Sequence, residues 1–179
     1  MPDCVLNPRN PEEPSKDPAV TVPSKLKIRA FLPDDLSAVL KIQDACKGIA
    51  SWRAIDYEHL AADPRGIFLV AELMEGNRAE LPGFLASYRI DTEAELWNIA
   101  VAPENRRRGI GSALLQDACR MLSAAGARRL FLEVRESNLA ALELYRFIGF
   151  TQLSRRRDYY QDPREDALIM VLNLASDQL

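Results

Sequence analysis

Residues 106–111 read Arg-x-x-Gly-x-Gly, a pattern whose arginines and glycines could bind an anion. Pro103 and Asn105 precede it and break the apolar run before it. From Ser112 onward apolar residues recur at helical spacing, at Leu114, Ala118, Met121, Leu122 and Ala125. The glycines therefore lie at a helix N-terminus, where unpaired N–H groups and the helix dipole favour negative charge. Because glycine lets a ligand approach the backbone, the segment is predicted to bind a phosphate or pyrophosphate.

Single positions exclude two common phosphate-binding motifs. A P-loop requires a lysine after its last glycine, and none follows Gly111. A dinucleotide-binding fingerprint requires a third glycine where Leu114 stands. Arg106, Arg107 and Arg108 could instead form a solvated basic turn or contact nucleic acid. The adjoining glycines and helix favour contacts to a pyrophosphate.

Glu133 is a carboxylate within an otherwise apolar strand. Alternation places Leu130, Leu132 and Val134 on one face and Phe131, Glu133 and Arg135 on the other. From the residues alone, a solvated or arginine-paired carboxylate is the better interpretation, because charged side chains are mostly exposed.

Tyr145 lies on a helix that begins near Ser137 or Asn138, both natural N-caps. It shares a helix face with Ala141, Leu142 and Ile148. On spacing alone, a core tyrosine with a satisfied hydroxyl is the better interpretation.

Five segments of the C-terminal half carry a family resemblance: NIAV, RRRGIG, LEVRESN, LYRFIGF and YYQDPREDALIM. In this order and spacing they resemble the GNAT superfamily of N-acetyltransferases, and within it the RimI-type ribosomal-protein alanine N-acetyltransferases. The resemblance implies acetyl-CoA as cosubstrate, without a metal. It implies that Glu133 is the general base, which accepts a proton through water, with Glu95 at the start of the preceding strand as the second candidate. It also implies that Tyr145 donates a proton to the departing thiolate, which is consistent with a tyrosine pKa of about 10, since such a hydroxyl holds its proton at neutral pH. It also implies cofactor contacts at Ile99, Ala100, Val101, Arg106, Arg107, Arg108, Gly109, Ile110, Gly111, Ser112 and Asn138.

Other segments bear on the acceptor. Residues 155–157 with Tyr159 and Tyr160 resemble a family segment at the peptide end of the cleft, although a solvated edge strand is the alternative. The tail at 1–24 is outside the family pattern, and residues 48–53 and 74–81 match it loosely. The resemblance implies acetylation of a protein's N-terminal α-amine, an N-terminal alanine of a ribosomal protein. A lysine or small-amine acceptor and a non-catalytic CoA-binding module are the alternatives.

Composition sets the remaining expectations. The chain has 179 residues, 47% hydrophobic and 27% charged, with a net charge of −3. This balance is typical of a globular domain and argues against nucleic-acid binding through bulk charge. No apolar run reaches the length of about 18 residues that a membrane helix needs, and the N-terminus lacks the basic start and apolar centre of a signal peptide, so a cytoplasmic protein is expected. A monomer is expected as well. Cys4, Cys46 and Cys119 are far apart, which predicts reduced thiols and neither a disulfide framework nor a metal site.

Periodicity divides the chain into a disordered proline-rich tail at 1–24 and one domain at 25–175. Helices are predicted from Pro33 to Gly48, over 54–62, from Ser112 and from about Asn138. Strands are predicted at 26–31, 66–72, 82–89, 96–101, 130–135, 150–160 and 167–174. Residues 96–101 read as a strand buried on both faces. The predicted class is α/β with the GNAT fold: a central mixed, mostly antiparallel sheet of six to seven strands with helices on both faces.

Overall fold

The computed structural model describes residues 23, 25–46, 49–75 and 78–174. Within these residues the strands are β1 (Leu26–Ala30), β2 (Gly66–Glu75), β3 (Arg78–Ile90), β4 (Glu93–Val101), β5 (Arg129–Arg135), β6 (Thr151–Gln161) and β7 (Arg164–Asn173). The α-helices are α1 (Leu36–Ala45), α2 (Ala54–Ala62), α3 (Ile110–Ala124) and α4 (Leu139–Ile148), and short 3-10 turns precede α1 and α3 at Pro33–Asp35 and Pro103–Asn105.

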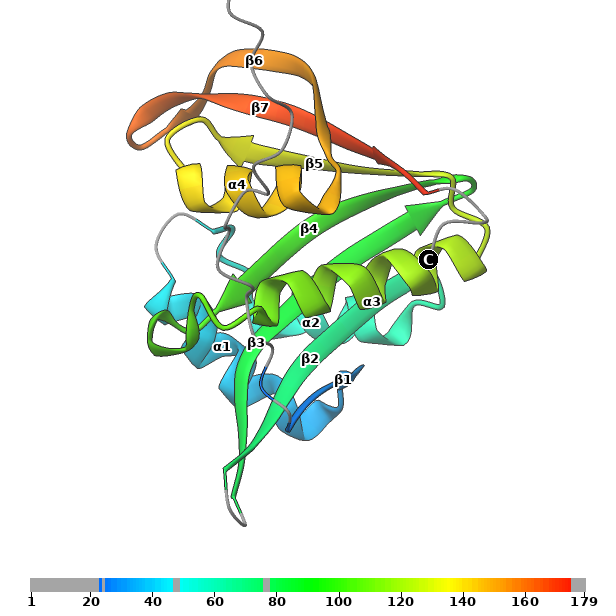
Figure 1. The fold of residues 1–179 in the computed structure, drawn as a ribbon, viewed down its shortest axis with the longest axis vertical. Coiled ribbons are helices and arrows are strands. Elements are labelled where there is room, and N and C mark those ends of the chain that lie inside the picture. Colours follow the sequence, from blue (N-terminus) through cyan, green and yellow to red (C-terminus); the bar gives the residue numbers. More distant parts are fainter. Residues whose placement is uncertain (1–22, 24, 47–48, 76–77, 175–179) are drawn as a thin grey trace, which may run out of the picture.

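The described strands form one sheet in the order β1-β2-β3-β4-β5-β7-β6 (Figure 1). Neighbouring strands are antiparallel except for β4 and β5, which are parallel. A parallel pair needs a crossover connection, and α3 supplies it. The mixed, mostly antiparallel sheet predicted from the sequence is therefore confirmed.

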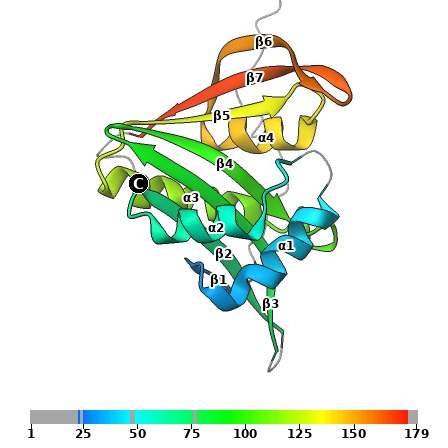
Figure 2. The same cartoon turned by 180° about the vertical axis from the view of Figure 1, so that it is seen from behind.

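Helices cover both faces of the sheet. Helices α3 and α4 lie in front of it in Figure 1, and α1 and α2 lie in front of it in the opposite view of Figure 2. Each face has its own buried cluster: Leu114, Leu122 and Leu130 belong to the α3 side, and Val39 and Phe84 to the α1 side. The sheet is thus the middle layer of the domain, and alternate residues of one strand serve different cores.

A β-bulge interrupts β4. Ala86 of β3 faces Asn98, but the next residue, Ser87, faces Leu96, which leaves Trp97 as an extra residue. A bulge shifts the alternation of side chains, so both Trp97 and Asn98 point toward the α1–α2 side, where they contact aromatic side chains and loop backbone. Beyond them, the partly buried Ile99 and Val101 pack on the α3 side.

The parallel pairing ends at the same place. Strand β4 pairs with β5 from Glu93 to Leu96, whose partner is Leu132, and no further pairing of these strands follows within the described residues. Figure 1 shows β4 and β5 separating from this point. Trp97 and Glu133 are the first residues past this fork, which opens a gap in the middle of the sheet.

Several predicted boundaries need correction. Strand β4 begins at Glu93, and it is not buried on both faces because Trp97 is 36% exposed. The hairpin strands β2 and β3 are longer than predicted because residues of the expected connection pair across it, as Met74 does with Ala79. Helix α3 begins two residues before Ser112, since Gly109 adopts the left-handed conformation that allows the turn into it.

The first helix ends earlier than predicted. Helix α1 stops at Ala45, whereas the sequence places its end at Gly48, which lies outside the described residues. Helix α2 spans the predicted residues. The predicted disordered tail at 1–24 also lies outside the described residues, apart from Pro23.

Candidate active site

A cleft of about 1360 Å³ follows the gap between β4 and β5. Its walls come from the residues before α2, from β4, from the start of α3, from β5, from α4 and from β6. The lining includes every residue for which the sequence suggests a catalytic or cofactor role except Arg108: Ile99, Ala100, Val101, Arg106, Arg107, Gly109, Ile110, Gly111, Ser112, Glu133, Asn138 and Tyr145. Its volume exceeds the range of about 300–1,000 Å³ for drug-sized ligands, so a longer molecule can fit.

The free edge of β4 forms one wall of the cleft. From Trp97 to Val101 the strand keeps its partner β3, but its other edge has no strand partner within the described residues. Such an edge presents N–H and C=O groups to an extended ligand, which can bind there as an added strand would.

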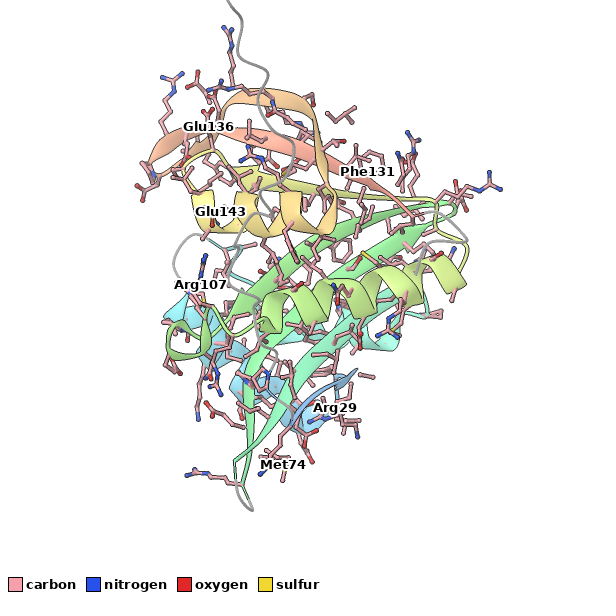
Figure 3. The ribbon with its side chains drawn as sticks, in the orientation of Figure 1. Arg29, Met74, Arg107, Phe131, Glu136 and Glu143 are labelled. Carbon is pink, nitrogen blue, oxygen red and sulfur yellow. The ribbon has the colours of Figure 1, made fainter. Side chains whose placement is uncertain are left out.

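The N-terminus of α3 closes the open end of the cleft. Gly109 is the N-cap residue in the left-handed conformation (φ 75°), and no side chain caps the helix. The first N–H groups of α3 therefore remain available to an anion. Arg107 also has a left-handed backbone (φ 62°), and its guanidinium faces Glu143 of α4 at 3.4 Å (Figure 3). Both side chains of this pair are exposed, so the pair is weak and Arg107 can exchange Glu143 for a phosphate.

The arginines on either side of Arg107 differ in their surroundings. Arg106 donates from Nε to the carbonyl oxygen of Val101 (3.2 Å), and its terminal nitrogen contacts the buried Cys46 Sγ (3.4 Å). Arg108 donates to Asn105 Oδ1 at 2.6 Å; Asn105 lines the cleft, whereas Arg108 itself does not. Asn105 is itself buried and donates to Glu80 (3.2 Å), so this contact braces the turn before α3.

Tyr145 reaches the cleft from the α3–α4 side of the sheet. The residue is only 6% exposed and packs against Phe150, with ring centroids 5.6 Å apart. Its hydroxyl makes no hydrogen bond to the described residues, which leaves it free to donate to a ligand. Burial, with a smaller effect from Tyr160, raises the pKa of Tyr145 above its ordinary value. The hydroxyl therefore keeps its proton throughout the neutral range.

Glu133 reaches the cleft from the opposite face. Leu132 and Val134 pack into the α3-side core, so the intervening Glu133 points to the α1–α2 side of the sheet. Its carboxylate forms an ion pair with Arg156 of β6, and its side chain stays 22% exposed. This carboxylate also raises the pKa of the neighbouring Tyr159. Glu133 and Tyr145 thus approach the fork from opposite sides, one as a carboxylate and one as a hydroxyl donor.

The second candidate base, Glu95, is also at the cleft, two residues before the bulge. It is exposed and accepts a hydrogen bond from the indole Nε1 of Trp97 (3.0 Å). Asn138 caps α4 by accepting from the N–H of Ala141 (3.2 Å), and it lines the cleft as well. The helix-cap role predicted for Asn138 is therefore confirmed.

The sequence reasoning missed the aromatic wall on the α1–α2 side. Trp97 stacks on Tyr88 with centroids 4.7 Å apart, and Trp52 meets Trp97 edge-on at 5.4 Å. Trp52 and Trp97 line the cleft, and the three aromatic rings also border a smaller pocket of about 440 Å³ over α2. Trp97 lies in a strand that was predicted to be buried on both faces. Its exposure depends on the bulge, so the sequence pattern did not indicate this wall.

Within the described residues, no three His, Cys, Asp or Glu side chains gather as a metal site would require. Cys46 and Cys119 are buried free thiols, and burial raises the pKa of Cys119 to about 11. Cys4 lies outside the described residues. None of the described helices is long and apolar enough to cross a membrane.

The chain belongs to the acetyltransferase (GNAT) family, whose model matches residues 36–150. It is similar to the ribosomal protein bS18-alanine N-acetyltransferase of Escherichia coli K12, with 43% identity over 98 residues, 54% of this chain and 66% of that relative.

Two further comparisons cover more of the chain. A Bacillus subtilis protein, named a putative ribosomal protein bS18-alanine N-acetyltransferase, is 33% identical over 148 residues, 82% of this chain and 95% of the relative. The crystal structure of the ribosomal-protein-S18-alanine N-acetyltransferase from Escherichia coli superposes with a TM-score of 0.73 at 32% identity. That match covers 86% of this chain and 98% of the other.

Proposed function

We propose that this protein transfers the acetyl group of acetyl-CoA to the N-terminal α-amine of a protein, the N-terminal alanine of a ribosomal protein. The observation that carries the proposal is the fork in the sheet, because an acid and a base reach it from opposite faces beside an anion site. The names of the similar enzymes from Escherichia coli and Bacillus subtilis support the same acceptor.

The described residues fit acetyl-CoA along the length of the cleft. The free backbone edge of Ile99, Ala100 and Val101 suits the amide groups of the pantetheine arm, which would lie beside it as an extra strand. The N–H groups at the start of α3, over residues 109–112, suit the pyrophosphate. Val101 lies at the pyrophosphate end of this stretch of β4, and the fork lies at its other end. The thioester, at the far end of the pantetheine arm, would therefore lie at the fork.

The flanking polar side chains have proposed roles in the same cleft. Arg106 and Arg107 would bind phosphate groups, since guanidinium groups pair well with phosphate oxygens. Asn138 would contact the cofactor while it caps α4. For Arg108 we propose bracing of the turn through Asn105, in place of the direct cofactor contact that the sequence suggests.

Acetyl-CoA supplies an activated acetyl group and a thiolate leaving group. Glu133 would accept the proton that the acceptor ammonium loses, through a water molecule, so that the free amine can form the new C–N bond. Tyr145 would donate its proton to the sulfur as the C–S bond breaks, which releases CoA as the thiol. Arg156 would hold the Glu133 carboxylate in place between β5 and β6.

The proton chemistry favours an α-amine as acceptor. At pH 7, freeing the neutral form of an α-amine costs about 1 kcal/mol, whereas a lysine side chain costs about 4.6 kcal/mol. A single carboxylate that acts through a water molecule is suited to deprotonating an α-amine, which costs less free energy. The lining of the cleft contains no histidine that could act as a stronger base among the described residues.

Release of the CoA thiol from acetyl-CoA, followed with a thiol reagent, tests this function. Thiol release should depend on an acceptor peptide with a free N-terminal alanine, and Glu133→Gln should slow it and steepen its increase with pH, because deprotonation is then left to bulk water. Tight binding of acetyl-CoA with no acceptor-dependent thiol release would instead identify a non-catalytic CoA-binding module.

A further inference from the structure

A buried hydrogen-bond network links the bulge of β4 to the loop before α2. Asn98 is 5% exposed and donates from Nδ2 to the carbonyl oxygen of Ala50 (3.0 Å) and to the hydroxyl of Tyr57 (3.2 Å). The Tyr57 hydroxyl donates in turn to Gln43 Oε1 (2.7 Å). Three elements, α1, α2 and β4, therefore meet at one buried polar cluster.

Gln43 binds the backbone of the loop at Trp52. Its side-chain oxygen accepts from the N–H of Trp52 (2.9 Å), and its side-chain nitrogen donates to the carbonyl oxygen of the same residue (3.0 Å). Together with the contact from Asn98, these bonds hold the loop at Ala50 and at Trp52. A side chain that satisfies both backbone groups of one residue fixes that residue's position more firmly than a single bond would.

The loop so fixed is part of the cleft. Ala50 and Trp52 line it, and the Trp52 ring contacts both Trp97 and Tyr57. Trp97 is the first residue past the fork, on the same side of the sheet as Glu133. The network therefore sets the position of an aromatic wall that faces the space from which an acceptor would reach the proposed base.

The side chains of this network are uncharged and are held in place by packing. Burial raises the pKa of Tyr57 to about 12, so its hydroxyl remains a donor across the working pH range. The Tyr57 ring also stacks on Phe68 with centroids 5.3 Å apart, which fixes the hydroxyl in the core. None of the side-chain nitrogen and oxygen atoms of this network is buried without a hydrogen-bond partner.

We propose that Gln43, Tyr57 and Asn98 are positioning residues for the acceptor, which hold Trp52 against Trp97 as the wall that orients the acceptor peptide at the fork. This inference rests on the proposed function, and it assigns to the bulge of β4 a role in selecting the acceptor. Without the network the loop would lose its fixed geometry, while the cofactor contacts at the start of α3 would remain.

Gln43→Met tests the proposal, because methionine keeps the unbranched shape and removes both bonds to Trp52 as well as the bond from the Tyr57 hydroxyl. The KM for an acceptor peptide should rise about 10-fold, as expected for the loss of the two hydrogen bonds that hold Trp52, with acetyl-CoA affinity unchanged. Asp35→Asn is the matched control: it weakens a contact of the 3-10 turn before α1, from the buried Asp35 to Arg29, at a site away from the cleft, and should leave this KM unchanged. Tyr57→Phe, which keeps the stacked ring, should give a smaller increase in this KM. It replaces Gln43→Met as the test if that variant does not fold.

Hydrogen exchange at the Trp52 amide provides a readout that needs no catalysis. This N–H donates to the Gln43 side chain, so Gln43→Met should accelerate its exchange while the amides of α3 keep their protection. Faster exchange with a raised acceptor KM supports the proposal. Faster exchange with an unchanged KM in both folded variants would overturn it, and absence of any transfer by the unmodified protein would instead refute the proposed function.

Discussion

Replacing Tyr145 with phenylalanine should lower kcat on the order of 10²-fold or more, with acetyl-CoA affinity preserved. The substitution removes one hydroxyl and keeps the ring packed against Phe150. The hydroxyl lines the cleft and has no hydrogen-bond partner among the described residues, so its removal leaves no buried group unsatisfied there. The loss should therefore fall on the proton donated to the departing thiolate and spare the fold.

Steady-state kinetics with a saturating acceptor, together with calorimetry for acetyl-CoA, measure this effect. Tyr88→Phe is a matched control because it removes only a hydroxyl that binds Asp63 outside the cleft (2.9 Å) and keeps the ring stacked on Trp97. It should keep kcat close to that of the unmodified protein. A Tyr145→Phe variant with unchanged kcat would mean that Tyr145 is a core residue and that another group protonates the thiolate.

Gly111→Asp should reduce acetyl-CoA affinity on the order of 10²-fold, because the carboxylate would take the position and the hydrogen-bond donors proposed for the pyrophosphate. Gly111 is the second residue of α3, where an acidic side chain interacts favourably with the helix dipole. The substitution should therefore preserve the helix while it blocks the anion site. A Cβ at this position would come within 3.1 Å of the Leu144 side chain, a contact that needs a small adjustment of α4.

Gly111→Asn separates charge from shape, since it makes the same contact with Leu144 without the negative charge. It should bind acetyl-CoA about 10-fold or more tightly than Gly111→Asp. Calorimetry on the two folded variants gives this ratio directly. Equal affinities would show that crowding of α4 is the only effect, and acetyl-CoA binding as tight as that of the unmodified protein would remove the proposed pyrophosphate site.

Local patterns predicted the part of the site that depends on local structure. The alternation over 130–135 placed Glu133 opposite the core face of β5, and the glycine-rich turn placed Gly109 at the start of α3, because both follow from the geometry of single elements. The residue types of Ser137 and Asn138, both natural N-caps, likewise predicted where α4 begins, and Asn138 is the cap. These features need only neighbouring residues, which a sequence displays directly.

Features that depend on strand register could not be predicted. The bulge at Trp97 arises from the pairing of β3 with β4, and it decides that Asn98 is buried among hydrogen-bond partners. Those partners, Tyr57 and Ala50, are more than 40 residues away in the chain. A tryptophan and an asparagine in an apolar run therefore reveal neither the aromatic wall nor the polar network.

Two interpretations of Glu133, an arginine-paired carboxylate and a proton acceptor, are compatible with each other. The residues alone favoured an arginine-paired carboxylate, and the ion pair with Arg156 of β6 is present. The same side chain lines the cleft at the fork, as a proton acceptor must. The pairing partner came from a distant strand, so the pattern predicted the type of contact without identifying the arginine.

The central claim is that the acceptor is an N-terminal α-amine, and mass spectrometry of two peptides tests it most directly. One peptide begins with a free alanine and contains no lysine, and its twin has a blocked N-terminus and an internal lysine. At pH 7 the free α-amine should be acetylated much faster, because its neutral form costs about 3.5 kcal/mol less to reach than that of a lysine. Equal rates on the two peptides, or faster acetylation of the lysine, would contradict the account and point to a lysine or small-amine acceptor.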